Sequence, residues 1–167
     1  MINVPKLFAN GWSGLIPPQF LLAKKKFKKV VLEPPDYNPG SWRGSGKVLR
    51  DYDTGEYWLT TRPRKAHPVR GYAVEIYRSN NGEDFTLAYS ITKEELSEMT
   101  GFEVKSIEGQ QILRDPATGR YHLYLSVDNV GTHPLQGWDT ILLVADDPKG
   151  PWEYKGFALK RGPGFDC

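Results

Sequence analysis

The chain has 167 residues, of which 39% are hydrophobic, which is enough for one modest globular domain. Its formal net charge is +2 with both signs interspersed. We therefore expect no nucleic-acid partner, since such a partner is indicated by a strongly basic face. No apolar run approaches the roughly 18 residues that span a bilayer, so we expect no membrane partner either.

The chain also lacks the patterns of disulfides, secretion and metal binding. The single cysteine, Cys167, has no partner for an internal disulfide. The first thirty residues contain no uninterrupted apolar segment of the secretory kind, so we expect a cytoplasmic protein. Histidines and acids do not occur at ligand spacing, so we expect no metal and no cofactor. Calcium held by loop carbonyls and one carboxylate would leave no pattern.

The predicted elements begin after a lysine-rich stretch, "AKKKFKK" (23–29), which is typical of a solvated segment or, alternatively, of contact with an anionic surface. Four runs of β-branched, aromatic and leucine residues between turn residues predict strands near 45–50, 56–61, 72–79 and 85–90. A short helix follows in "TKEELSEMTG" (92–101). Thr92 is its expected N-cap, Glu95 completes a capping box, and Gly101 ends it.

The remaining strands, near 107–113, 120–126, 138–145 and 152–159, form a second copy of the first unit. "GSGKVLRDYDTGEYWLTTR" (44–62) aligns with "EGQQILRDPATGRYHLYLS" (108–126), 64 positions later. "HPVRGY" (67–72) returns as "HPLQGW" (133–138), 66 positions later. Each unit is predicted to be a four-stranded antiparallel meander, and two such sheets that stack about an axis indicate an all-β fold of β-propeller blades.

We divide the chain into segments of a single partial propeller domain, 1–167. They are an N-terminal segment with a closing strand (1–43), a blade (44–91), a helical connection (92–105), a second blade (106–160) and the start of a next blade (161–167). Propellers close with about four to eight blades, so two blades leave sheet edges bare. We expect the remainder of a propeller, or a second chain, to cover these edges.

Several phrases carry a family resemblance: "SIEG" (106–109), "YHLYLS" (121–126), "GPWEYKG" (150–156) and "SNNGEDF" (79–85). They resemble phrases in the blades of five-bladed glycoside hydrolases of families 43, 32 and 130. The resemblance implies a partial five-bladed propeller that corresponds to the N-terminal part of such an enzyme. It also implies hydrolysis of glycosidic bonds in a carbohydrate substrate, or phosphorolysis if the protein follows family 130. At least one catalytic aspartate would then belong to further blades.

Glu108 is the residue for which the resemblance implies general-acid catalysis, because family 43 has its acid in a Glu-Gly-Pro stretch before such a strand. The repeat singles it out as well, since the equivalent position is Gly44. Ile107 and Ile112 are expected to surround it with apolar groups that disfavour its charged form, as a general acid requires. The alternatives are a solvated glutamate or one paired with Lys105.

Asp115 is predicted to have a different role. The start of the first strand and the loop between the second and third strands emerge on one face of a meander blade, whereas the first hairpin lies on the other. Glu108 therefore belongs to the first face and Asp115 to the second. Because Asp115 recurs as Asp51, a turn role is expected. The alternative is catalysis, since family 32 uses an "RDP" triplet.

Other candidates would complete a carbohydrate site. A glycosidase needs a second carboxylate on the same face, and Asp128, Asp166 and Asp36 are available, each of them alternatively a solvated loop acid. For substrate binding we expect an aromatic platform and polar groups from Trp42, Arg43, Arg62, His67, His133 and Asp36. The same platforms without paired acids would suit a non-catalytic carbohydrate-binding or scaffold subunit, and bare edges would suit subunit interaction; both alternatives stay open.

Overall fold

The computed structural model describes residues 29–129 and 138–160, apart from the side chain of Ser45. The chain divides into two compact units, Met1–Val30 and Val31–Cys167. The fold described below is that of the second unit. Whether the whole chain is one domain with the predicted segment boundaries stays a prediction.

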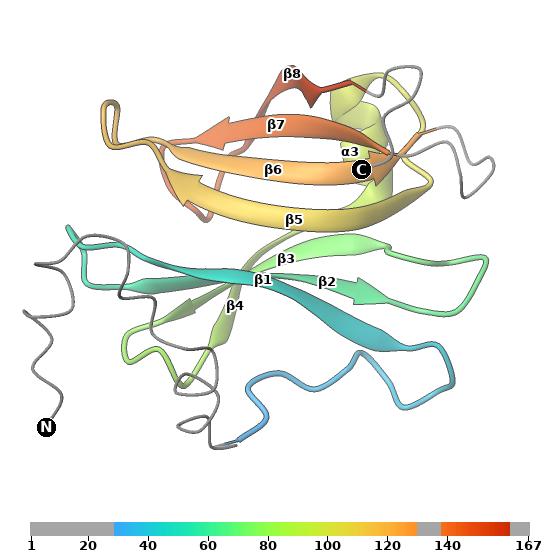
Figure 1. Ribbon diagram of the computed structural model, residues 1–167, viewed down its shortest axis with the longest axis horizontal. Helices are drawn as coiled ribbons and strands as arrows, with labels where there is room; N and C mark the ends of the chain where they lie inside the picture. Colours follow the sequence, from blue (N-terminus) through green and yellow to red (C-terminus); the bar gives the residue numbers. More distant parts are fainter. Residues whose placement is uncertain (1–28, 130–137, 161–167) are drawn as a thin grey trace, which may run out of the picture. The chain divides into compact units, whose positions relative to one another are not determined.

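The second unit contains two four-stranded sheets, in which every strand pairs antiparallel with the next strand along the chain (Figure 1). The first sheet consists of β1 (Trp42–Arg50), β2 (Tyr57–Arg64), β3 (Ala73–Ser79) and β4 (Thr86–Thr92). The second consists of β5 (Ser106–Arg114), β6 (Tyr121–Asp128), β7 (Asp139–Ala145) and β8 (Glu153–Leu159). The prediction of eight strands in two meanders is confirmed.

The first strand of each sheet contains an irregularity. In β1 the register shifts between Ser45 and Val48, and in β5 it shifts between Ile107 and Gly109. Such bulges turn side chains away from the regular alternation. β1 also begins three residues before the predicted start, because Trp42 still pairs with Arg64 across the sheet.

The hydrophobic core lies between the facing sides of the two sheets. Alternate residues of β6, namely Tyr121, Leu123, Leu125 and Val127, are buried, as the period of two along a strand requires. The core also contains Trp58, Val74, Ile76, Ile91, Ile107, Ile112, Ile141, Leu143 and Trp152. Each fully buried large aliphatic side chain contributes about 1.5–3 kcal/mol, so stacking of the sheets supplies the main stabilisation.

Helix α3 (Lys93–Thr100) connects the two sheets. The Thr92 hydroxyl accepts a hydrogen bond from the Glu95 amide at 3.2 Å, and the Glu95 carboxylate accepts one from the Thr92 amide at 2.7 Å. Gly101 ends the helix at φ 77°, so the predicted capping box and left-handed stop are confirmed. Leu96 anchors the helix in the core. Within the described residues, no helix is long and apolar enough to cross a membrane.

The hairpins between the first two strands of each sheet share a turn but differ in burial. In the second sheet, Asp115 accepts hydrogen bonds from the Ala117 amide at 2.9 Å and the Thr118 hydroxyl at 2.7 Å, which is the predicted turn role. Asp51 accepts the equivalent bond from the Asp53 amide at 2.9 Å. It also accepts bonds from Tyr121 and Arg114 of the second sheet. Asp51 therefore ties the two sheets together.

Candidate functional site

The loop between β2 and β3 brings the first sheet to the start of β5. The Gly71 carbonyl accepts a hydrogen bond from the Ile107 amide at 2.9 Å. The Gly71 amide donates to the Ser106 hydroxyl at 3.0 Å. The start of β5 and this loop therefore lie at the same end of the two sheets, as the blade topology predicts.

Glu108 lies at this junction with its side chain only 4% exposed. Its carboxylate accepts hydrogen bonds from Arg62 Nη1 at 2.7 Å, from the Ser106 hydroxyl at 2.7 Å and from Arg70 Nη2. Arg64 Nη1 lies 3.5 Å from the same oxygen that Arg62 contacts. Three guanidinium groups and one hydroxyl thus surround the carboxylate.

Asp128, at the end of β6, shares one of these partners. Arg70 donates through Nη1 to Asp128 at 2.5 Å and through Nη2 to Glu108, so one guanidinium joins the two carboxylates. The Asp128 side chain is 7% exposed. Burial alone would lower the pKa of Arg70, but its bonds to Asp128 and the charge of Glu108 raise it. The bridging guanidinium is therefore firmly cationic.

The backbone of Arg70 supports the importance of this bridge. Among the non-glycine residues that the structure describes, Arg70 alone has a positive φ, 55°. This left-handed conformation is unfavourable for a residue with a β-carbon, and it persists where contacts hold it. Backbone hydrogen bonds with Lys65 and Ala66 hold the loop, and the two ion pairs hold the side chain, so the loop directs this guanidinium at both acids.

The expected apolar surroundings of Glu108 are wrong. Ile107 and Ile112 are fully buried in the core between the sheets, whereas the carboxylate points into the arginine cluster. The register of β5 shifts between Ile107 and Gly109, so Glu108 is the extra residue of a bulge, and its side chain leaves the core that holds Ile107. Pairing with Lys105 is not found either, because that ammonium lies 3.6 Å from Glu103. Glu108 is an ion-paired carboxylate.

The side chains of Trp42 and Arg43 project to opposite faces of β1, as those of successive strand residues do. The guanidinium carbons of Arg62 and Arg64 lie 4.9 and 5.6 Å from the centre of the Trp42 ring, which places the indole in the Glu108 cluster. Arg43 instead pairs with Glu75 and donates to the Glu33 carbonyl at 2.9 Å. The structure therefore brings Trp42 and Arg62 to the acids, but not Arg43.

Of the other predicted site residues, Asp36 and His67 are described by the structure, and neither is joined to this cluster. Asp36 pairs with Lys65 at 3.2 Å, and hydrogen bonds from Ser41 and the Asn38 amide lower its pKa to about 2. His67 is exposed in the loop between β2 and β3. Asp166 and His133 lie outside the described residues. The roles assigned to all of these residues stay predictions.

Sequence reasoning missed Arg70 and Ser106. Arg70 stands in "HPVRGY", where the repeat has Gln136 in "HPLQGW". The departure from the repeat that singled out Glu108 therefore marks Arg70 as well. Ser106 has no comparable signal, because a serine before a strand is ordinary turn chemistry.

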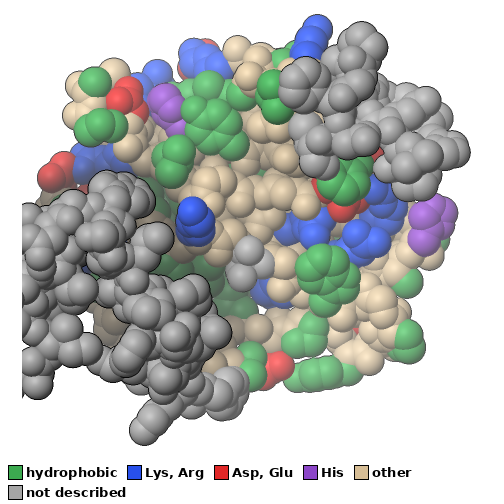
Figure 2. All heavy atoms as spheres, in the orientation of Figure 1, with side chains coloured by type: hydrophobic (Ala, Val, Ile, Leu, Met, Phe, Trp, Pro, Cys, Tyr) green, Lys and Arg blue, Asp and Glu red, His purple; other side chains and the backbone are tan. Residues whose placement is uncertain are grey.

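The junction of the two sheets is marked by its net charge and not by a hollow in the surface. The five charged side chains joined there, Arg62, Arg64, Arg70, Glu108 and Asp128, leave an excess of one positive charge. Figure 2 shows lysine and arginine side chains gathered at the end of the molecule where β2 ends in Figure 1. A hollow lies at another part of the surface.

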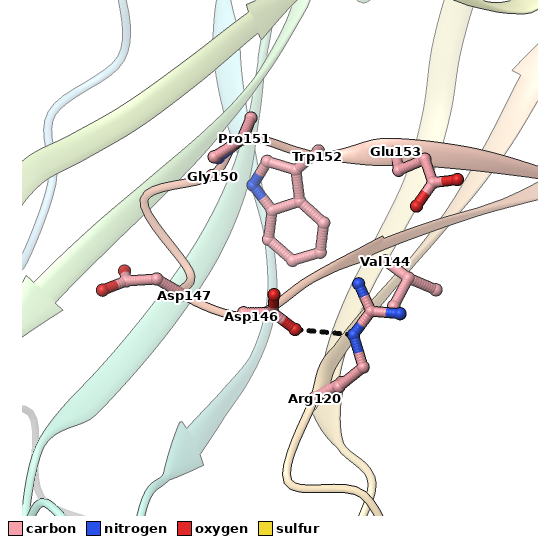
Figure 3. A pocket seen from close by; sticks show the side chains of 8 residues that line it. All are labelled: Arg120, Val144, Asp146, Asp147, Gly150, Pro151, Trp152 and Glu153. Carbon is pink, nitrogen blue, oxygen red and sulfur yellow. Dashed lines mark hydrogen bonds and ion pairs between the residues drawn. The ribbon is translucent and has the colours of Figure 1, made fainter.

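That hollow, of about 280 Å³, lies beside the turn between β7 and β8 (Figure 3). Trp152 forms its floor and donates from its indole nitrogen to the Pro148 carbonyl at 3.3 Å. Arg120 and Asp146 form an ion pair at 2.7 Å across one side. The Asp146 side chain is largely solvated, so we place the candidate site at the buried acids around Arg70.

No protein-family profile matches the sequence, and a search of curated proteins found no match. Solved structures do match. A family 117 glycoside hydrolase from the marine bacterium Zobellia galactanivorans is 18% identical, with a TM-score of 0.55, over 78% of this chain and 43% of that one. The GH43_1 enzyme from Xanthomonas citri, complexed with xylotriose, is 9% identical, with a TM-score of 0.53, over 68% of this chain and 32% of that one.

A thermostable family-43 glycoside hydrolase is 16% identical, with a TM-score of 0.50, over 81% of this chain and 38% of that one. The chain thus spans less than half the length of each of these structures. At such identities the similarity concerns the fold. The fold is that of blades from the five-bladed propellers of glycoside hydrolases, which confirms the predicted architecture.

Proposed function

We propose that the protein acts on carbohydrates through the junction of the two blades and cleaves glycosidic bonds with Glu108 and Asp128. The observation that carries the proposal is the bridge of Arg70 between these two carboxylates. Glycoside hydrolysis requires two carboxyl groups on either side of one bond, about 5–9.5 Å apart. Glu108 has the role of general acid, and Asp128 that of nucleophile or base.

The ion pairs impose a condition on this chemistry. A general acid must carry a proton, whereas Glu108 is held as an acceptor by Arg62, Arg70 and Ser106. Sugar that enters between the acids must therefore displace Arg70 from Glu108. Trp42, at 43% exposed, offers the apolar platform for the sugar ring beside them.

A second candidate function is carbohydrate binding without cleavage. Three guanidinium groups around Glu108 favour this binding function. They donate to both carboxylate oxygens and so occupy the positions where the proton of a general acid would sit. In this case Glu108 orients arginines that donate to sugar hydroxyls. The two functions use the same site, and they differ in whether the glycosidic bond is cleaved.

The test compares the native chain with Glu108→Gln on aryl glycosides of several sugars, with and without inorganic phosphate. Loss of a general acid lowers the rate by about 10²–10⁴-fold on poor leaving groups. Dinitrophenyl glycosides need no protonation of the leaving group, so their cleavage should fall much less. Equal losses on both substrates would contradict the acid role, and sugar binding without turnover would establish the second function.

Asp128→Asn is the corresponding variant that tests the second carboxylate. If Asp128 is the nucleophile or base, this change lowers the rate on both kinds of leaving group, because the carboxylate acts whichever group departs. Undiminished turnover in Asp128→Asn would remove this residue from the reaction. A phosphate requirement in the native chain would indicate phosphorolysis.

A further inference from the structure

Among the residues that the structure describes, the cluster around Glu108 contains more cationic groups than its acids neutralise. Glu108 and Asp128 face Arg62, Arg64 and Arg70, and the nearby Lys65 is matched by Asp36. A neutral sugar would leave this excess unchanged. A ligand that brings one negative charge would balance it.

Arg64 is the least engaged of the three arginines. Its only ion pair within the described residues is the 3.5 Å approach to a Glu108 oxygen that already accepts from Arg62 at 2.7 Å. Its side chain is 29% exposed. A guanidinium offers five N–H donors in a planar fork that matches carboxylate and sulfate oxygens. Most of the Arg64 fork is therefore free to receive a ligand.

Arg62 carries a second unmet donor. Its Nε is buried and has no hydrogen-bond partner among the described residues. A β-carbon at Gly44 would lie 3.4 Å from Nε and 3.3 Å from Nη2, so this edge of the fork faces Gly44. Gly44 is the position where the second blade has Glu108. The first blade thus presents a cation without the carboxylate that the repeat would supply.

Both unmet donors lie against Trp42. The same β-carbon at Gly44 would approach the Trp42 ring at 3.1 Å, and the Arg64 guanidinium lies 5.6 Å from the ring centre. An indole binds the apolar face of a sugar ring, while the adjacent forks bind its charged substituent. The buried Arg62 Nε without an acceptor is unfavourable, and the partly exposed Arg64 has unused donors, so a ligand that supplies acceptors gains affinity.

We infer that the ligand is an acidic carbohydrate, whose carboxylate or sulfate ester is received by Arg64 and Arg62 beside Trp42. The inference rests on the proposed carbohydrate function and narrows it to sugars that carry an anionic group. Uronic acids and sulfated sugars share this chemistry.

The test is titration calorimetry with three oligosaccharides of equal length: an oligogalacturonate, a sulfated galactan oligosaccharide and a neutral galactan oligosaccharide. We expect at least one acidic ligand to bind about tenfold or more tightly than the neutral one, as one charge-assisted contact provides. Arg64→Gln should abolish this preference, so that the ratio of acidic to neutral affinity falls to about one. Trp42→Ala should weaken both. The acidic ligand that binds more tightly identifies the source of the anion.

Arg78→Gln is the matched control, because Arg78 pairs with Glu56 away from the cluster and should leave the preference intact. Arg64→Lys keeps the positive charge but loses the planar guanidinium, so its preference for acidic ligands should be intermediate. If Arg64→Gln does not fold, Arg64→Lys takes its place in the test. Neutral ligands that bind as tightly as acidic ones, or a preference that survives loss of Arg64, would overturn the inference alone. Absence of binding by all three ligands would overturn the carbohydrate function too.

Discussion

Asp51 and Asp115 occupy equivalent positions in two related hairpins. Asp51 is buried, at 1% exposed, whereas Asp115 is partly exposed. Burial alone would raise the pKa of Asp51, but hydrogen bonds from Tyr121 and from the Asp53 amide lower it. The folded protein therefore favours the ionised carboxylate more than the unfolded chain does. Its contribution to stability is present above the ordinary pKa of 3.8 and is lost as the pH falls through the lower folded pKa.

We therefore predict that Asp51→Asn lowers the free energy of unfolding at pH 7 by about 1–3 kcal/mol, because Tyr121 and Arg114 lose a buried charged acceptor, while Arg114 keeps only its pair with the exposed Asp53. The difference from the native chain should shrink below the ordinary pKa of Asp51. Urea unfolding at neutral and acid pH measures both effects. Asp115→Asn is the control and should cost less, since its partners are in its own exposed turn. Equal losses at the two positions would contradict the account.

The role of a residue could be predicted from the sequence only where the repeat or turn chemistry constrained that role. Glu108 and Asp115 were separated correctly between the two ends of the blades, because strand order alone determines this. The arginine partners of Glu108 could not be predicted in the same way. They come from another blade, and their positions depend on packing between sheets and on the bulges in β1 and β5.

The strands and the helix were predictable because their signals are local. Alternation of apolar residues, turn residues and the capping box of α3 all act within a few positions. The contact of the loop between β2 and β3 with β5 has no local signal. It depends on Gly71, where a β-carbon would lie 1.9 Å from the Ile107 carbonyl oxygen.

Gly71→Ala should therefore push this loop away from β5. We predict a loss of about 1–3 kcal/mol in the free energy of unfolding, since a methyl group is forced against backbone. The change should also weaken carbohydrate binding, because Arg70 moves with its neighbour. Gly109→Ala is the control: its β-carbon would meet only the Ser126 side chain, at 3.3 Å. Thermal unfolding that ranks Gly109→Ala as the more damaging change would contradict this explanation.

At the scale of the whole unit, two related blades have diverged into complementary partners. Arg64 and Asp128 are equivalent in the repeat, as are Gly44 and Glu108. Cations of the first blade consequently meet acids of the second blade at one junction. The fold is shared with propeller glycoside hydrolases, and in this chain the charged junction consists of Arg62, Arg64, Arg70, Glu108 and Asp128.

The central claim is that this junction binds the carbohydrate. Its most direct test is an X-ray structure of the chain soaked with the acidic oligosaccharide of highest affinity. We predict electron density for a sugar ring against Trp42, with its anionic group on Arg64 and a glycosidic oxygen close to Glu108. Density confined to the hollow beside Trp152, or an arginine cluster unchanged at saturating ligand, would contradict the claim.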